Sequence, residues 1–176
     1  MESAKTEDLL NWSLPRVLER EARDNPDRPF LTVVGEGAQT IAECYAFATG
    51  IAAVLLDLGV AQGDRVVVMA HNSLTAVHVW LAINLLGAID VAINTAYRGP
   101  TLEHAVNLVG ATDLIAEQEF LAVLAASESK FSALKTILCC HSGVTTRSRA
   151  AAFSSVELQQ LEDLLREGAK GDGDRA

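Results

Sequence analysis

The 176-residue sequence is short of positive charge. Its 14 lysines and arginines face 23 aspartates and glutamates, which gives a formal net charge of −9. The basic residues form no stripe, so the chain lacks the phosphate-neutralising groups that dominate nucleic-acid binding. We therefore expect no nucleic-acid partner. The hydrophobic fraction of 49% is ordinary for a globular protein and excludes a chain that is disordered throughout.

Long apolar runs and cysteines are also scarce. The richest apolar stretch, 76–89, is interrupted by polar residues and is shorter than the roughly 18–20 residues of a membrane-spanning helix. The acidic N-terminus does not resemble a secretory signal. The cysteines are Cys44, Cys139 and Cys140, an odd number with two adjacent, which suits apolar packing better than disulfides or a metal site. We expect a cytoplasmic protein with no transmembrane segment.

Three motifs that mark catalytic or nucleotide sites in α/β proteins are absent. They are the dinucleotide fingerprint G-x-G-x-x-G after a strand, the phosphate loop G-x-x-x-x-G-K-[ST] and the nucleophile elbow G-x-S-x-G. Residues 142–147 combine hydroxyl groups, one glycine and Arg147, but bulky Val144 favours an ordinary surface loop. His71 and His78 are interpreted as structural histidines, because no nucleophile is paired with them. We assign no catalytic residue and no metal ligand.

What the sequence does contain is an alternation of helical and strand patterns. A helix from Leu14 and a hairpin around Gly35-Glu36-Gly37 come first, followed by a long helix over 44–58. The strand predicted at 65–70 is apolar throughout, as expected for a parallel strand covered on both faces. Further helices are predicted at 73–86, at 100–109 and near 120–124. Another helix is predicted to begin at an apparent capping box at 154–157. Further strands are predicted at 89–94, 113–116 and 135–139. The pattern predicts an α/β fold with a mostly parallel sheet flanked by helices.

Several short segments occur in the order and spacing of one enzyme superfamily. Over about residues 14–140 they resemble the N-terminal portion of the acyl-adenylate-forming (AMP-binding) superfamily, most closely acyl-CoA synthetases of the crotonobetaine- or fatty-acid-CoA ligase type. The chain has His71, Leu74 and Ala92 at three positions where that superfamily usually has proline. The matching segments are Thr40-Ile41-Ala42-Glu43-Cys44, Gly63-Asp64-Arg65-Val66-Val67-Val68, Asn72-Ser73, Leu86-Gly87-Ala88-Ile89 and Thr95-Ala96-Tyr97-Arg98-Gly99.

The resemblance implies an activity and a division of the chain. A complete enzyme of this type would convert a carboxylic acid to acyl-AMP with ATP and Mg²⁺ and then pass the acyl group to CoA. The expected layout is an N-terminal extension (1–13), a partial AMP-binding-type domain (14–167) forming an incomplete N-terminal lobe, and a flexible tail (168–176). The superfamily's phosphate loop, adenine- and magnesium-binding motif, ribose-binding aspartate and catalytic lysine have no counterpart here.

We therefore expect the N-terminal fragment of an acyl-CoA synthetase that binds no cofactor and is inactive by itself. ATP, Mg²⁺ and CoA would serve only the complete enzyme, with a partner chain or a C-terminal part supplying the missing motifs. One alternative is a non-catalytic interaction lobe, or half of a split enzyme. Another is an unrelated α/β binding domain.

The candidate substrate contacts follow two predicted parallel strands, at the sheet edge where ligands gather in such folds. The simpler interpretation gives Asn72 or Ser73 the role of a helix N-cap and Arg98 a surface ion pair. The six candidates for contact with the acyl or CoA group in a complete enzyme are Asn72, Ser73, Asn94, Thr95, Tyr97 and Arg98.

Overall fold

A computed structural model of the chain describes residues 12–141 and 152–173, with side chains described as far as residue 168. The first elements are helix α2 (Leu14–Asp24) and the antiparallel hairpin of β1 (Pro29–Val33) and β2 (Gly37–Thr40). Gly35 and Gly37 have φ angles of 91° and 109° in the turn, a conformation that favours glycine. Segment 142–147 lies outside the described residues.

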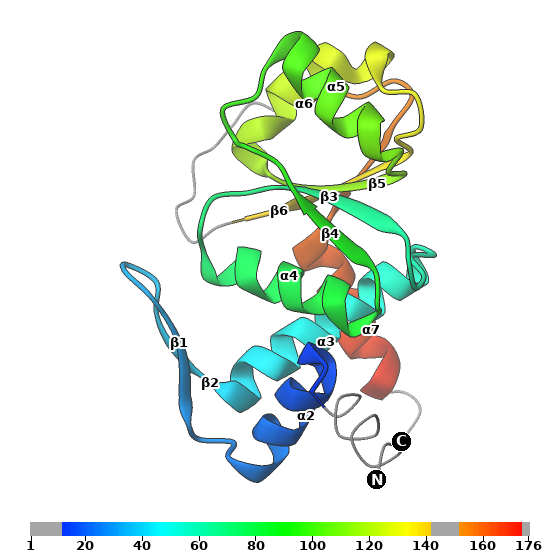
Figure 1. The fold of residues 1–176 in the computed structure, drawn as a ribbon. Helices are drawn as coiled ribbons and strands as arrows, with labels where there is room; N and C mark the ends of the chain where they lie inside the picture. Colours follow the sequence, from blue (N-terminus) through cyan, green and yellow to red (C-terminus); the bar gives the residue numbers. More distant parts are fainter. Residues whose placement is uncertain (1–11, 142–151, 174–176) are drawn as a thin grey trace, which may run out of the picture.

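A five-stranded parallel sheet forms the centre of the chain, with strand order β4-β3-β5-β6-β7. This confirms the predicted fold class. The helices alternate with the strands along the chain (Figure 1). The elements after the hairpin are α3 (Ile41–Asp57), β3 (Arg65–Met69), α4 (Leu74–Leu85), β4 (Ile89–Ala92), α5 (Gly99–Val109), β5 (Asp113–Glu117), η1 (Gln118–Phe120), α6 (Leu121–Ser127), η2 (Glu128–Lys130), β6 (Thr136–Cys140), β7 (Glu157–Gln160) and α7 (Leu161–Gly173).

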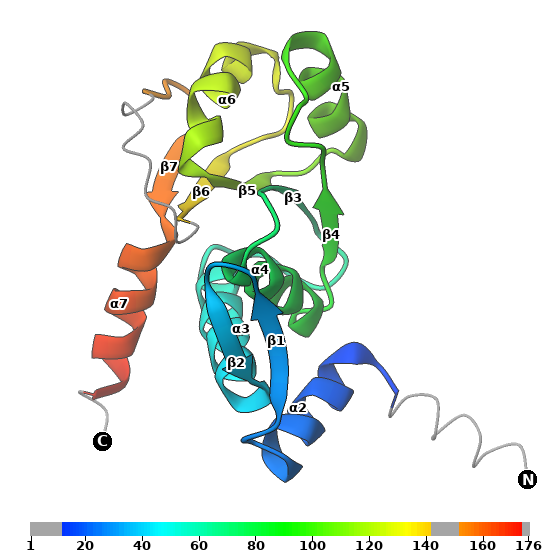
Figure 2. The same ribbon diagram turned by 90° about the vertical axis from the view of Figure 1, so that its left-hand side faces the viewer.

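Helices cover both faces of this sheet, as Figures 1 and 2 show. Helices α3, α4 and α7 lie on one face, over Val66, Val68 and other side chains of the same orientation. Helices α5 and α6 lie on the other face, over Val67 and Met69. Alternate residues of a strand point to opposite faces, so a strand covered on both faces must be apolar throughout. This is why residues 65–70 show no polar alternation.

The hairpin and α2 pack against α3 and α4 rather than extending the sheet (Figure 2). Helix α3 begins with a reciprocal capping box, in which the Thr40 hydroxyl accepts a hydrogen bond from the Glu43 backbone N–H at 3.2 Å. The Glu43 carboxylate in turn accepts from the Thr40 N–H at 2.8 Å. His78 on α4 is buried, hydrogen-bonded to Gln39 and stacked on Phe47, as predicted for a structural histidine.

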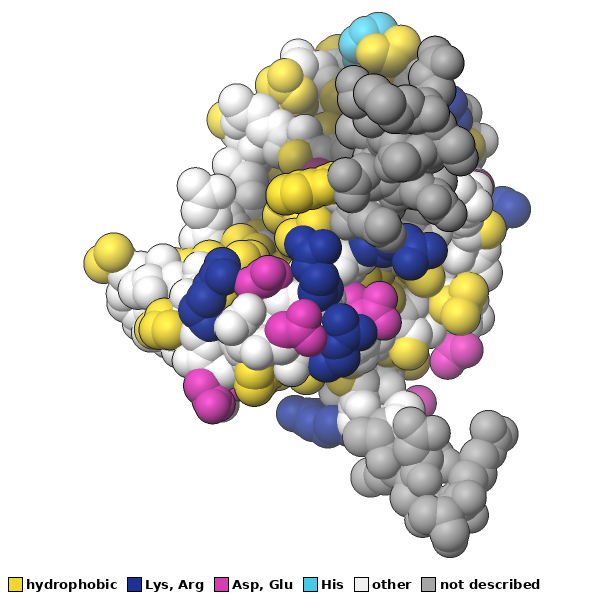
Figure 3. Space-filling model, turned by 60° about the horizontal axis from the view of Figure 1, so that its bottom comes forward, with side chains coloured by type: hydrophobic (Ala, Val, Ile, Leu, Met, Phe, Trp, Pro, Cys, Tyr) yellow, Lys and Arg dark blue, Asp and Glu magenta, His cyan; other side chains and the backbone are white. Residues whose placement is uncertain are grey.

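The outer surface near α2 carries charges of both signs. Ion pairs join Arg23 to Asp24 at 2.9 Å and Arg28 to Glu21 at 2.7 Å. On the face seen in Figure 3, basic and acidic side chains are interspersed and form no field of a single sign. Within the described ranges, no helix combines the length and hydropathy required to cross a membrane.

The C-terminal elements correct one sequence prediction. Residues 154–157 do not open a helix, because Glu157–Gln160 forms strand β7, which pairs in parallel with β6. The helix begins only at Leu161 and continues to Gly173, beyond its predicted end at Gly168. Gly168 does not adopt the left-handed conformation that commonly ends a helix.

The three cysteines are free and buried, as expected for apolar packing. Burial raises the pKa of the Cys139 thiol to about 11 and also raises that of Cys44. For Cys140, burial together with the negative charge of Glu117 raises the pKa far above its usual value.

We expect these thiols to react with an aromatic disulfide reagent at pH 8 at least about tenfold more slowly in the folded chain than in denaturant, because the thiolate is the nucleophile. The absorbance of the released aromatic thiolate, followed over time, measures both rates. All three thiols should react in urea. Equal labelling rates in the folded chain and in denaturant would contradict the burial of the three thiols.

Candidate functional site

The strand ends at the carboxyl edge of the sheet bring polar side chains together. All five strands are parallel, so the segments after β4, β3, β5, β6 and β7 leave the sheet at the same edge. Ligands of open α/β sheets bind at this edge. Two histidines lie here, His71 two residues after β3 and His141 directly after β6. Each is held by a carboxylate from a neighbouring element.

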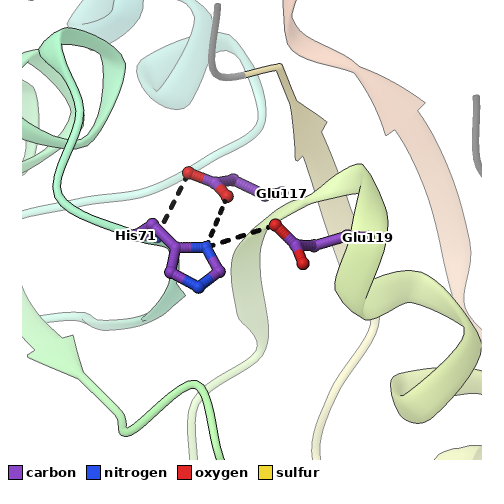
Figure 4. A group of neighbouring side chains, drawn as sticks. All are labelled: His71, Glu117 and Glu119. Carbon is purple, nitrogen blue, oxygen red and sulfur yellow. Dashed lines mark hydrogen bonds and ion pairs between the residues drawn. The ribbon is translucent and has the colours of Figure 1, made fainter. Parts of the chain in front are cut away.

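His71 lies between two glutamates (Figure 4). The carboxylate of Glu117, the last residue of β5, accepts hydrogen bonds from the His71 backbone N–H at 3.1 Å and faces its ring Nδ1 at 3.1 Å. The Glu119 carboxylate in η1 lies 3.2 Å from the same Nδ1. Glu117 is buried, whereas the side chains of His71 and Glu119 are about half exposed. The ring of His71 also packs against Phe120, with ring centroids 5.1 Å apart.

His141 repeats this arrangement with a different partner. Glu162 at the start of α7 accepts from the His141 backbone N–H at 2.9 Å and faces its Nδ1 at 3.1 Å. The Nε2 atom of His141 lies 2.5 Å from the side-chain oxygen of Gln118. The hydroxyl of Thr75 on α4 donates to the His141 carbonyl. These contacts tie α4, η1 and α7 to the sheet edge.

The first two predicted site residues lie beside His71. Ser73 is buried and is the N-cap of α4, because its hydroxyl accepts from the Ala76 N–H at 3.0 Å. Asn72 is exposed and lines a hollow. The structure thus gives Ser73 the helix-capping role that the sequence offered as the simpler interpretation.

The other four predicted residues lie in the loop after β4, which ends at Ala92 rather than at the predicted Asn94. The Asn94 side chain accepts from the Ala96 N–H at 2.8 Å and so closes a local turn. The Arg98 guanidinium donates to the carbonyls of Thr95 and Tyr97, at 2.6 and 2.7 Å, and it forms no ion pair with any residue that the structure describes. Tyr97 packs against the hydrophobic core beneath α5 and α6. The side chains of Asn94 and Arg98 are therefore engaged within the loop itself.

A hollow of about 330 Å³ lies between the hairpin, the ends of β3 and β4, and α4. Its wall is largely apolar, with Asn72 and His71 at its polar part. Asp90 of β4 is its acidic group, and burial raises the pKa of that carboxyl. The apolar wall is made of Val33, Val68, Ala70, Ala76, Val77, Trp80, Ala92 and Ile93.

A second hollow, of about 490 Å³, lies between α3 and α7, and its ionisable lining residues are Asp57 and Glu167. Neither hollow has lysine or arginine among its lining residues. A triphosphate needs cationic side chains or clustered backbone N–H groups around it. Neither hollow therefore offers the cationic side chains that commonly hold a triphosphate.

Sequence reasoning missed Glu117, Glu119, Gln118 and Glu162 as members of this edge. Their contacts with the two histidines depend on the strand order, which places β5 between β3 and β6. The available signal was a histidine at the end of two predicted strands and an acidic residue at the end of a third. That signal indicates proximity only once the strands are known to be parallel neighbours.

Comparison with known proteins gives a consistent result. The family model described as "AMP-binding enzyme" matches residues 18–169. The chain is 36% identical over 113 residues to the medium/long-chain-fatty-acid–CoA ligase FadD6 of Mycobacterium tuberculosis, a match that covers 64% of this chain and 19% of that protein. It is 33% identical over 113 residues to the human mitochondrial medium-chain acyl-CoA ligase ACSF2, covering 64% and 18%. The matched part thus spans about a fifth of each relative.

Solved structures share the fold. The anthranilate CoA ligase AuaEII, crystallised with anthranoyl-AMP, superposes with a TM-score of 0.73 at 24% identity, covering 89% of this chain and 28% of that one. The N-terminal domain of FACL13 from Mycobacterium tuberculosis gives a TM-score of 0.67 at 23% identity, covering 88% and 35%. The sheet and its two helical layers therefore correspond to the N-terminal portion of these enzymes.

Proposed function

Because the chain belongs to the AMP-binding enzyme family, we propose that it forms the N-terminal part of an acyl-CoA ligase. Such an enzyme joins a carboxylic acid to coenzyme A through an acyl-adenylate. The observation that carries this proposal is the family match over residues 18–169, which takes in the whole parallel sheet. The named functions of FadD6 and ACSF2 support a medium- or long-chain fatty acid as the substrate class.

Within this part we propose that the apolar hollow beside α4 faces the acyl or pantetheine portion of a substrate. Its apolar wall suits a hydrocarbon group, and burial of such groups is favourable. Asn72 is the predicted contact residue best placed for this role, because it is exposed and lines the hollow. Ser73, Asn94, Thr95, Tyr97 and Arg98 would act by shaping the two loops around it.

We propose that ATP, Mg²⁺ and CoA are held mainly by the rest of such an enzyme. The described hollows have no lysine or arginine in their lining, and the sequence contains no phosphate-loop motif, which supports this proposal. The chain by itself is then catalytically incomplete. Its free, buried cysteines support a reducing compartment such as the cytoplasm.

The test joins the chain to the parts it lacks. In a chimera, residues 18–169 replace the matched segment of FadD6, and acyl-CoA formation is measured with medium- and long-chain acids, ATP, Mg²⁺ and CoA. We expect the chimera to form acyl-CoA and the isolated chain to release no pyrophosphate above a heat-denatured control. A folded but silent chimera contradicts the proposed role, and turnover by the isolated chain contradicts its incompleteness.

A split enzyme or a scaffold is the second candidate. Large apolar side chains are exposed on separate elements, with Leu56 60% and Leu108 72% accessible, and these positions are available to a partner. Co-purification with a chain that carries the missing motifs, and pyrophosphate release only by the mixture, would favour the split enzyme. Co-purification without turnover would favour the scaffold.

A further inference from the structure

The cluster of His71, Glu117 and Glu119 is the feature of the sheet edge that the ligase proposal leaves unexplained. It joins three separate positions of the fold: the loop after β3, the last residue of β5, and η1. One ligand atom from each side chain, an imidazole nitrogen and two carboxylate oxygens, lies within 4.8 Å of the other two. Figure 4 shows both carboxylates directed at the same ring nitrogen.

The two carboxylates compete for one proton. An imidazole Nδ1 carries at most one hydrogen, yet Glu117 and Glu119 lie at 3.1 and 3.2 Å from that atom. Two well-directed hydrogen bonds to one N–H are not available, so the contact of one glutamate is only electrostatic. Among the described residues, both glutamates form ion pairs with His71 alone, and His71 carries at most a single positive charge. The negative charge of the cluster is therefore incompletely balanced.

A divalent cation resolves both features. It supplies two positive charges, and each of the three atoms donates a lone pair to it without competition. Zn²⁺ binds imidazole nitrogen and carboxylate oxygen at about 2.0–2.2 Å, so neighbouring ligand atoms of a tetrahedral site lie about 3.3–3.5 Å apart. The two nitrogen–oxygen separations, 3.1 and 3.2 Å, are within a few tenths of an ångström of that edge length, and the two carboxylate oxygens lie within 4.8 Å of each other.

The surroundings hold the ligands in place. The Glu117 carboxylate is anchored by the His71 backbone N–H, and its side chain is buried. The ring of His71 is packed against Phe120, which is itself buried. Glu119 is 48% exposed and free to adjust by the small distance that coordination requires, while its exposure leaves an entry path. Such support of the ligands by neighbouring groups is what a metal site needs.

We propose that His71, Glu117 and Glu119 bind one divalent transition-metal ion, with Zn²⁺ or Co²⁺ as the ion that suits the ligands. One nitrogen and two oxygen donors favour these ions over Ca²⁺ and Mg²⁺, which prefer sites made of oxygen alone. Three protein ligands leave a fourth position for water or a substrate group. The site does not depend on the ligase proposal, since it uses only residues of this chain.

The experiment measures metal binding to the 176-residue chain after treatment with a chelator and desalting. Co²⁺ is titrated first, because its visible spectrum changes on binding to nitrogen and oxygen ligands at low coordination number, and Zn²⁺ is then used to displace it in calorimetry. We expect one ion per chain. Zn²⁺ should also raise the melting temperature of the chain, since it binds the folded state.

Two variants and two matched controls identify the ligands. Glu119→Gln changes a half-exposed side chain, so the fold is retained, and His71→Gln removes the shared nitrogen. Each should weaken Zn²⁺ binding by at least about tenfold, because losing even an outer partner of a metal ligand costs roughly 10–100-fold. Glu162→Gln alters the His141 pair, and His104→Gln alters an exposed histidine of α5; both should bind as the parent does.

Three results would overturn the site. They are no saturable binding at about 100 μM metal, equal metal affinity of Glu119→Gln and the parent, and a loss of metal affinity in Glu162→Gln equal to that in Glu119→Gln. The last result would show that binding is not specific to the His71 cluster. Because the readouts are spectra, heats and melting temperatures, failure of the site is distinguishable from failure of the ligase proposal, which is measured by acyl-CoA formation.

Discussion

Replacing either Leu114 or Ile115 with alanine is expected to lower the free energy of unfolding by about 2–5 kcal/mol. These neighbours lie in β5, the central strand of the sheet, and are 0% and 1% exposed. Leu114 packs beneath α5 and α6, whereas Ile115 packs beneath α3 and α4. Each truncation removes buried apolar surface and leaves a cavity between two rigid layers, which cannot collapse to fill it.

Urea unfolding followed by far-UV circular dichroism measures both losses. Ile89→Ala on the edge strand β4 is the matched control, because Ile89 is 46% exposed and its truncation should cost no more than about 1 kcal/mol. In a sheet covered on one face only, one of the two β5 variants would be close to neutral. That result would contradict the two-sided packing on which the assignment of the fold depends.

The elements with strong apolar patterns could be predicted from the sequence. Strand β3 reads as apolar throughout because both its faces are covered, and helices α3 and α5 show apolar residues at helical spacing before a terminal glycine. Helix α3 begins three residues before its predicted start, at a capping box formed by Thr40 and Glu43. In these segments local preference and tertiary packing favour the same conformation.

The region around β7 could not be predicted in this way. Its sequence, Glu157–Gln160, contains no β-branched or aromatic residue, and the preceding serines resemble a helix start. The strand forms because its backbone pairs with the buried strand β6, so tertiary context outweighs local preference. The His71–Glu117 contact depends likewise on two strands adjacent in the sheet, although its partners are 46 residues apart in the chain.

The serines before β7 bind a single carboxylate, which leads to the second large effect. Glu128 in η2 is 8% exposed and accepts hydrogen bonds from the backbone N–H groups of Ser154, Ser155 and Val156 at 2.8, 2.6 and 2.9 Å. Both serine hydroxyls donate to it as well, at 3.1 and 3.0 Å. These donors, first among them the Ser155 N–H, lower the pKa of Glu128 from 4.5 to about 2.

Glu128→Gln should therefore lower the melting temperature by roughly 5–10 °C at pH 7. Glutamine offers one acceptor oxygen where the carboxylate has two, and its amide group would meet N–H donors instead of acceptors. The Val156 N–H is buried, so a donor that loses its partner there is not satisfied by water. Glu103→Gln is the matched control, because Glu103 accepts one hydrogen bond from the Ser127 hydroxyl and its loss should change the melting temperature little.

The pH dependence distinguishes the charged anchor from simple packing. The pKa of Glu128 is lower in the folded chain than in the unfolded one, so its contribution to stability is complete above about pH 4.5 and is lost as the pH falls towards 2. The melting temperatures of the parent and of Glu128→Gln should accordingly converge over that interval. The Glu103→Gln variant should run parallel to the parent. By about pH 2.5 most of the charge-dependent contribution should be lost. A difference in melting temperature between the parent and Glu128→Gln that stays constant down to this pH would show that lost packing, rather than the ionised carboxylate, causes it.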